Sequence, residues 1–328
     1  MPTNPNRIQV HIDRALTNIS VAYIQSASAF ISARVFPVVP VQKQSDRYFV
    51  YKREDWYRDE AKERAPMTES AGGGYDIDNT PTYFCKKYAY HKDVGEEDRT
   101  NADAPLNPDQ DAVDFVTTKL LLKREVLWAE KFFTSGVWST EYTGVAATPG
   151  AGQFLQWNDA TSNPIEDIDK AQTMLLELTG YKPNKLVLGA WTYKALKNHP
   201  NILDRIKYTQ RGIVTTDILA MLFDVDEVLV AEAVQNLSPK GVAENNKFIL
   251  GKHALLVYAA PRPALKTPSA GYTFAWTGLM GAGAYGNRIL RFPMDHLGVG
   301  TERIEGEMAF DQKVVAADMG VFFKDAVA

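Results

Sequence analysis

The chain has 328 residues, of which 40 are acidic and 36 basic, and 45% are hydrophobic. This length holds about two domains with real cores, and a charged fraction of 23% excludes a largely disordered chain. The formal net charge of −4 argues against a dedicated nucleic-acid binder, which normally carries a basic excess.

Three features bear on compartment and membrane association. Cys85 is the only cysteine, so no internal disulfide and no cysteine-based zinc cage can form, which indicates a reducing compartment. Residues 1–7 lack the apolar core of a signal peptide. The longest apolar run, residues 254–260, is far shorter than the roughly 20 residues that span a bilayer. We therefore expect no export by the usual route and no membrane association.

The first forty residues predict an arm that leads into the body of the protein. Apolar residues between positions 8 and 36 show no sustained period, and a short helix is expected around Thr17–Phe30. Pro37 and Pro40 then impose an extended path, because proline fixes φ and restricts the residue before it.

The segment from Lys43 to Arg64 has an unusual composition. It contains seven basic and six acidic residues among twenty-two, interleaved with aromatic residues. A glycine turn at 72–74 and a second aromatic run at 83–90 follow, which predicts a long two-stranded hairpin with a flexible tip. Such a hairpin is marginal alone in water, and nothing in its own sequence supplies a third strand. Two interpretations remain: a solvated loop, or a hairpin that lies on a neighbouring subunit where charges of both signs find partners.

The rest of the chain predicts a long helix, an α/β region and a strand-rich end. Asn107-Pro108-Asp109 is a helix-start signal, and the apolar pattern continues to about residue 134, so a helix of about 25 residues is expected to be about 37 Å long. Its apolar residues cover more than one stripe, which indicates packing on more than one side. Further helices are expected at 165–179, 191–198 and 216–222, and strands at 185–189, 227–231, 248–250, 254–260 and from 272 onward.

A search for catalytic, metal and cofactor motifs finds none that is convincing. Residues 281–286 match G-x-G-x-x-G, but an extended, proline-stopped segment follows where a helix is required. The Asp76–Asn79 stretch begins like a calcium loop and lacks its glycine and glutamate. The five histidines never fall at the spacing of a zinc site, and acidic pairs such as Asp93 with Glu96 are best explained as a solvated acidic stretch. We therefore expect no enzyme activity and no cofactor, and the absence favours a structural role.

Three stretches resemble segments of the major capsid proteins of tailed bacteriophages. These are residues 184–209, from Asn184-Lys185-Leu186 to Lys207-Tyr208-Thr209, then Arg303-Ile304-Glu305-Gly306, and the closing residues 316–327. The resemblance extends along the whole chain through the order of its elements: arm, extended loop, long helix, α/β middle and strand-rich end.

The resemblance implies an α+β fold, the tailed-phage capsid fold, with an N-terminal arm (1–40) and an extended β-hairpin loop (41–98). A peripheral domain (99–165 plus 287–312) would contain the spine helix (109–134), and an axial domain (166–286 plus 313–328) would meet its copies at the centre of hexamers and pentamers. The residues expected to contact a neighbouring subunit are the charged and aromatic ones of the loop: Arg47, Lys52, Arg53, Glu54, Asp55, Trp56, Arg58, Glu60 and Lys62. Reversal of Arg53 and Arg58 to glutamate is expected to leave the monomer folded and to block assembly.

The function implied is that of a major capsid protein that self-assembles into an icosahedral head around double-stranded DNA. It would be a virion component assembled in the host cytoplasm, with scaffolding, portal and decoration proteins as further partners. No basic lining, no sequence-specific DNA contact and no lysine crosslink through Lys43, Lys52 or Lys62 is expected. The alternatives are an encapsulin-like cellular compartment of the same fold, and an enzyme whose site is dispersed beyond motif recognition.

Overall fold

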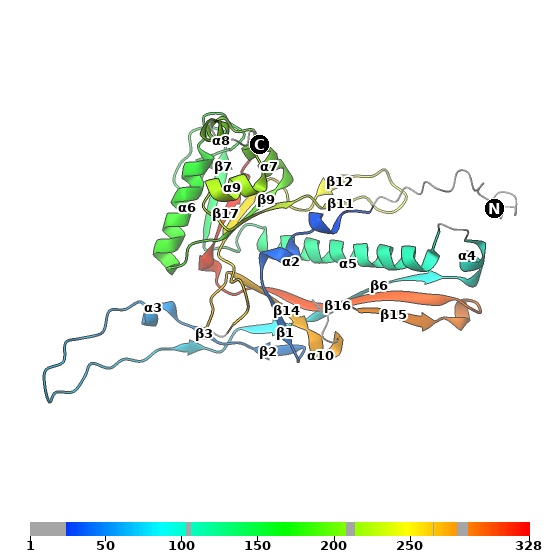
Figure 1. Cartoon of the computed structure of the whole chain (residues 1–328), viewed down its shortest axis with the longest axis horizontal. Coiled ribbons are helices and arrows are strands. Elements are labelled where there is room, and N and C mark those ends of the chain that lie inside the picture. The colour runs from blue at the N-terminus through cyan, green and yellow to red at the C-terminus, as the bar shows by residue number, and fades with distance from the viewer. Residues whose placement is uncertain (1–23, 103–105, 208–213, 265, 281–287) are drawn as a thin grey trace.

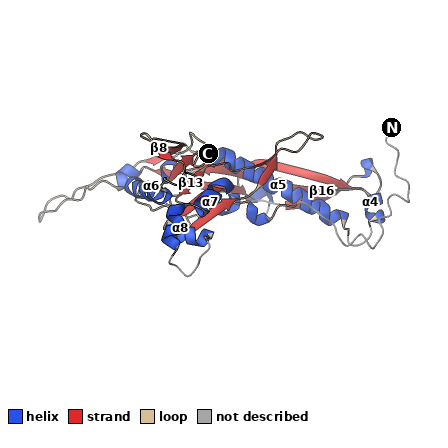
Figure 2. Ribbon diagram, turned by 90° about the horizontal axis from the view of Figure 1, so that it is seen from above, coloured by secondary structure: helices blue, strands red, loops and turns tan. Residues whose placement is uncertain are grey.

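The computed structural model describes residues 24–102, 106–207, 214–264, 266–280 and 288–328. The molecule is elongated: a long helix lies over one sheet, a second sheet with its helices forms the upper part, and a hairpin projects from the body (Figure 1). The view from above shows the same elongation, with α5 running beside β16 (Figure 2). The α+β fold expected from the sequence is confirmed.

The first sheet, here called the long sheet, has five strands: β1 (Val38–Val41), β6 (Lys86–Val94), β14 (Gly271–Trp276), β15 (Arg288–Pro293) and β16 (Glu302–Val314). β16 is the central strand. It pairs with β6 along one edge and with β15 and then β14 along the other, all antiparallel, while β1 pairs parallel with β14. The prolines of the arm therefore lead directly into an edge strand, since an edge position tolerates a missing N–H donor.

Helix α5 (Pro108–Phe132) is the long helix expected from the sequence, and it lies along β16. Asn107 caps its first turn by accepting from the Gln110 N–H, and Pro108 occupies the first helical position. Four helical residues rise 6.0 Å and two strand residues about 6.6 Å, so a buried helix residue at every fourth position meets every second strand residue. Ala112 accordingly packs near Ile304, and Val116 lies over Gly306.

The second sheet, here called the upper sheet, has the strand order β10-β9-β13-β17-β7-β8. Its strands are β7 (Thr140–Val145), β8 (Gln153–Leu155), β9 (Lys185–Gly189), β10 (Glu227–Ala231), β13 (Ala254–Val257) and β17 (Gly320–Lys324). Alternate residues face opposite sides. Leu186 and Leu188 pack against α6 (Pro164–Thr179), α7 (Ala190–Lys197), α8 (Pro200–Ile206) and α9 (Thr216–Leu222), while Val187 packs with the end of α5. Burial on both faces explains the continuous apolar runs of these strands.

The C-terminal end of α5 joins the two halves of the molecule. Trp128 and Phe132 have no exposed surface and pack with Phe36 of the arm and Phe322 of β17. The helix thus packs on the long sheet over its first turns and on the upper sheet over its last, as the double apolar stripe predicts. The arm is fixed here as well: Glu125 accepts hydrogen bonds from the N–H groups that open helix α2 (Ser32–Val35).

The remaining described elements are short. They are η1 (Ala27–Ala29), β2 (Ser45–Arg47), β3 (Val50–Tyr51), α3 (Arg53–Trp56), β4 (Ile77–Asp78), β5 (Thr82–Phe84), α4 (Glu96–Asn101), β11 (Val234–Asn236), β12 (Asn246–Phe248), α10 (Thr277–Met280), η3 (Asp295–Leu297) and η4 (Ala317–Met319).

The structure corrects several sequence expectations. Residues 86–94 do not continue the hairpin, because β6 pairs with β16 and so belongs to the long sheet. Strands β7 and β8, which the sequence analysis did not predict, join the upper sheet, and β14 joins the long sheet. Strand pairing between segments more than a hundred residues apart decides these groupings, and periodicity does not report it. The helix expected at Thr17–Phe30 lies largely outside the described residues, and within them only the single turn η1 forms.

Candidate assembly surface

The hairpin, defined here as residues 42–85, has both of its ends on the body and its tip far from it (Figure 1). Its first rungs pair β2 with β5 and β3 with β4, both antiparallel. At its base Tyr83 stacks on Phe274 of β14, with ring centroids 4.6 Å apart. The Phe84 N–H donates to Asp311 of β16 at 3.0 Å, and Lys131 of α5 holds the same carboxylate at 2.6 Å. The base is therefore part of the protein's own core.

Two contacts tether the middle of the hairpin to the upper half of the molecule. Arg53 forms an ion pair with Asp318, and the Tyr57 hydroxyl donates to the carbonyl of Thr179 at the end of α6. Gly180, which follows, is in the left-handed region at φ 71°, and a Cβ there would lie 2.8 Å from the Tyr57 hydroxyl oxygen. Glycine at this position thus serves both the helix end and the close approach of Tyr57.

Beside the tether, three aromatic rings form a cluster that stays partly exposed to solvent. Trp56 packs against Tyr51 edge-on at 6.1 Å between ring centroids and against Tyr75 at 5.7 Å. Trp56 and Tyr75 nevertheless keep 54% and 57% of their surface exposed. Exposed aromatic area of this kind is typical of protein–protein interfaces.

The nine residues expected to contact a neighbour divide into two groups. Lys52, Arg53 and Asp55 bind within their own chain: Lys52 pairs with Asp76 across the hairpin at 2.9 Å, and Asp55 accepts from the Asp76 N–H at 2.9 Å. The remaining six are exposed and lie on the hairpin: Arg47, Glu54, Trp56, Arg58, Glu60 and Lys62. Among them, Arg58 forms exposed ion pairs within the hairpin, with Glu60 at 3.4 Å and with Asp55 at 3.9 Å.

Sequence reasoning missed Tyr57, Tyr75 and Asp76 as members of this surface. Asp76 and Tyr75 lie some twenty positions from the residues they contact, so only the pairing of the two limbs brings them together. The aromatic enrichment of the 48–57 segment was the available signal for Tyr57.

A serine and a histidine that meet in the upper half do not form a nucleophilic pair. His199 lies with Nε2 3.0 Å from Ser162 Oγ, and both are buried. The Asn201 N–H donates to His199 Nδ1, so Nε2 carries the proton and donates toward the carbonyl of Asp159. A ring nitrogen that is already protonated cannot accept the serine proton. The pair is a helix cap for α8.

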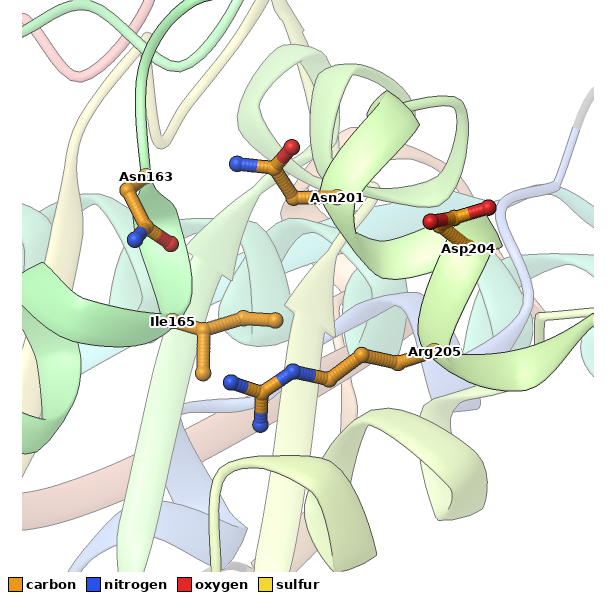
Figure 3. A pocket seen from close by; sticks show the side chains of 5 residues that line it. All are labelled: Asn163, Ile165, Asn201, Asp204 and Arg205. Atoms are coloured by element: carbon orange, nitrogen blue, oxygen red, sulfur yellow. The ribbon is translucent and has the colours of Figure 1, made fainter.

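Two hollows of the described chain are smaller than an ordinary small-molecule site. The hollow at the starts of α6 and α8 measures about 280 Å³ and is lined by Asn163, Ile165, Asn201, Asp204 and Arg205 (Figure 3). Small-molecule pockets are usually larger and mostly apolar. Among the described residues no three His, Cys, Asp or Glu side chains gather as metal ligands do, and no helix has the length and apolar character to cross a membrane. The G-x-G-x-x-G stretch at 281–286 lies outside the described residues.

Cys85 is buried beneath the base of the hairpin. Burial raises the pKa of its thiol to about 12. The side chain is therefore a protonated, packed thiol at neutral pH.

Comparison with known proteins shows which families have similar sequences. The model of the family described as "Phage major capsid protein E" matches residues 155–258. The major capsid protein of Burkholderia phage BcepMu is 30% identical over 235 residues, covering 68% of this chain and 69% of the relative. The major capsid protein of Pseudomonas phage JBD67 is 28% identical over 322 residues, 97% of each chain.

Solved structures show the same fold. A phage-related protein from Bordetella bronchiseptica RB50 superposes with a TM-score of 0.67 at 21% identity, covering 92% of this chain and 93% of that one. The SrpI encapsulin from Synechococcus elongatus PCC 7942 superposes with a TM-score of 0.58 at 11% identity, over 95% of this chain and 93% of that one.

The fold is that of tailed-phage capsid subunits, a class whose members are structural and not enzymes. The chain belongs to the family of phage major capsid proteins, so it is a virion component that assembles with copies of itself into a shell. The family resemblance, the fold and the non-enzymatic role expected from the sequence are confirmed.

Proposed function

We propose that this capsid protein forms hexamers and pentamers of an icosahedral head around double-stranded DNA, and that the hairpin is the principal clamp between neighbouring subunits. One observation carries the proposal: past the tether at Tyr57, residues 58–74 leave the body and carry exposed charges of both signs, with Met67 fully exposed. An isolated hairpin without a third strand is marginal in water, so a neighbour that covers it supplies the missing packing.

The two halves of the molecule have separate roles in this proposal. The upper sheet and its helices form the axial domain, which meets its copies at the centre of each capsomer, and α5 with the long sheet forms the peripheral domain. Residues Arg47, Glu54, Trp56, Arg58, Glu60 and Lys62 contact the neighbour, while Lys52, Arg53 and Asp55 set the direction in which the hairpin leaves. Scaffolding, portal and decoration proteins are further partners, and assembly takes place in the host cytoplasm.

Charge reversal at Arg58 and Lys62 tests the clamp more cleanly than reversal at Arg53, because Arg53 joins the hairpin to Asp318 of the body, whereas Arg58 pairs with Glu60 and Asp55 of the exposed hairpin itself. Exposed pairs of this kind contribute about 0–1 kcal/mol. We expect Arg58→Glu with Lys62→Glu to leave the unfolding midpoint of the free chain unchanged. Shell yield in negative-stain micrographs should fall at least about tenfold, since like charges placed together at an interface cost several kcal/mol.

The matched control keeps charge at the same positions, as Arg58→Lys with Lys62→Arg, and should assemble normally. Normal shells from the reversed variant would show that the hairpin does not clamp neighbours. A stable small oligomer from the unmodified chain under all salt conditions would refute shell formation itself.

A cellular compartment is the second candidate, because the SrpI encapsulin shares the fold. Nuclease-treated shells purified from the native host separate the two. Protected double-stranded DNA supports the phage head, and a protein cargo without DNA supports the compartment.

A further inference from the structure

One surface of α5 and the neighbouring strand β6 gathers lysines and aromatic rings. Lys119 and Lys123 lie one helical turn apart on the exposed side of α5, and Lys92 extends from β6 beside them. The ammonium groups of Lys92 and Lys119 lie 6.0 and 5.4 Å from the ring centre of Phe115, which is itself exposed. We call Lys92, Lys119 and Lys123, with Phe115, Tyr88 and Tyr90, the basic strip.

The rings hold the strip together. Tyr90 packs on Phe115 at 5.9 Å between ring centroids, and the Lys123 ammonium group lies 6.0 Å from the ring centre of Tyr88. Each exposed cation–π contact is worth roughly 0.5–1 kcal/mol, which favours positions of these ammonium groups beside the rings at the surface.

The charges of the strip are not neutralised within the described chain. None of its three lysines forms an ion pair with another described residue. The opposite face of the same strands is different: Glu307 lies between Lys87 and Arg288, and Arg303 binds Asp93 through two nitrogens. Burial opposes ionisation of Glu307, but hydrogen bonds from its two partners prevail and lower its pKa. The charges on that face are thus paired within the sheet, whereas the three lysines of the strip form no ion pair with a described residue.

Acidic residues lie on α5 on both sides of the strip. Asp111 and Asp114 precede Phe115, and Glu130 lies beyond Lys123. From Phe115 to Lys123, two helical turns or about 10 Å, the exposed charged side chains of α5 are Lys119 and Lys123.

We propose that the basic strip binds the phosphate backbone of the packaged double-stranded DNA without reading its sequence. The inference rests on the proposed function, in which the shell encloses DNA. Lysines bind phosphate as point charges, and the strip has no arginine, asparagine or glutamine to pair with base edges. Its surface is a helix side and a strand edge, away from the described hollows, which suits an extended polyanion better than a folded acidic peptide. The strip revises the expectation that the wall has no basic lining.

Fluorescence anisotropy of a labelled 30-base-pair duplex with the full, unassembled chain tests the strip. The variant carries Lys92→Gln, Lys119→Gln and Lys123→Gln. With about 0.9 counterions released per phosphate contact, the slope of log K against log salt should become shallower by about 2.7, and affinity in low salt should fall at least about tenfold. A triple arginine variant should bind like the unmodified chain.

The control is Lys194→Gln, because Lys194 also lies over an exposed ring, 5.3 Å from the ring centre of Trp191, but on α7. It should bind like the unmodified chain. Equal binding by the triple glutamine variant, or an equal loss in the control, would overturn the proposal. Polyglutamate of matched charge that binds the strip as tightly as the duplex would overturn it too, in favour of an acidic protein partner.

Micrographs of the triple glutamine variant separate this inference from the proposed function. Shells of normal size with weakened DNA binding support the strip. Loss of strip-dependent DNA binding has no bearing on the clamp, and failure of the unmodified chain to form shells counts against the proposed function even where the duplex still binds.

Discussion

Glu125 is the residue on which the attachment of the arm depends. Its carboxylate has no exposed surface and accepts from the Ile31 and Ser32 N–H groups at 3.1 and 2.9 Å, beside Arg124, which donates to the Ser32 hydroxyl. Helix α2 has no side-chain cap of its own, so Glu125 supplies one from another element. Two opposed effects act on it: burial raises its pKa, and the hydrogen bonds from Ser32 and Ile31 lower it, with burial the larger.

This balance predicts a pH dependence. A carboxyl whose pKa is raised by folding stabilises the fold fully below its unfolded value, and that contribution is lost as pH rises through the folded value. Glu125→Gln cannot ionise, so it should match the unmodified chain within about 1 kcal/mol at pH 4 and become relatively more stable toward pH 7. Urea unfolding of the free chain at several pH values measures this.

The exposed Glu130→Gln on the same helix serves as control and should shift stability by less than about 0.5 kcal/mol at every pH. Should the unmodified chain instead gain on Glu125→Gln as pH rises, the amide donors and Arg124 would outweigh burial.

At the scale of elements, the match between α5 and β16 depends on a missing side chain. Gly306 lies beneath α5, and a Cβ there would come within 2.5 Å of Val116 Cγ1 and 2.7 Å of Leu120 Cδ1. Helix and strand approach closely because this position is glycine. Above the same strand, Met308 and Phe310 pack against Leu120, which fixes the helix along the strand as well as against it.

Gly306→Ala should therefore destabilise the folded chain by about 2 kcal/mol, the usual cost of overpacking a close-packed interface. Gly74→Ala is the matched control, since a Cβ at Gly74 in the hairpin meets nothing within 4 Å. Urea unfolding of both variants gives the difference. Equal stabilities would mean that α5 adjusts freely on the sheet.

At the scale of the whole molecule, the body carries a hairpin that is attached at its base and middle and extends away from it at the tip. The base packs on β14 and the middle is tethered at Thr179 and Asp318, but residues 58–74 extend away from the body (Figure 1). A segment held this way is open to proteases in the free chain and closed to them once a neighbour covers it.

Trypsin should accordingly cut the free chain first at Lys62 and Arg64, and should cut assembled shells at these sites at least about tenfold more slowly. Mass spectrometry of the fragments over time identifies the sites. Lys240, in the exposed turn between β11 and β12, provides an internal comparison. Equal cutting at Lys62 in both states would contradict burial of the hairpin in the shell.

Much of the local structure followed from the sequence. Helices α5, α6, α7 and α9 and strands β9, β10, β13 and β17 have caps and apolar runs that act over a few residues, which the sequence displays directly. Helix α8 and strands β7 and β8 were not predicted. The dense charge and the aromatic residues at 43–64 likewise predicted the hairpin.

Contacts between segments that lie far apart in the chain could not be predicted from the sequence. The sequence could not show that Arg53 pairs with Asp318, that Glu125 caps the arm, or that Lys92 of β6 joins Lys119 of α5. Nor could it assign β7 to the upper sheet and β14 to the long sheet. The near balance of 40 acids and 36 bases is a property of composition. Which of those charges neutralise one another and which face a partner is decided only by the tertiary structure, because pairing depends on distance in space and not along the chain.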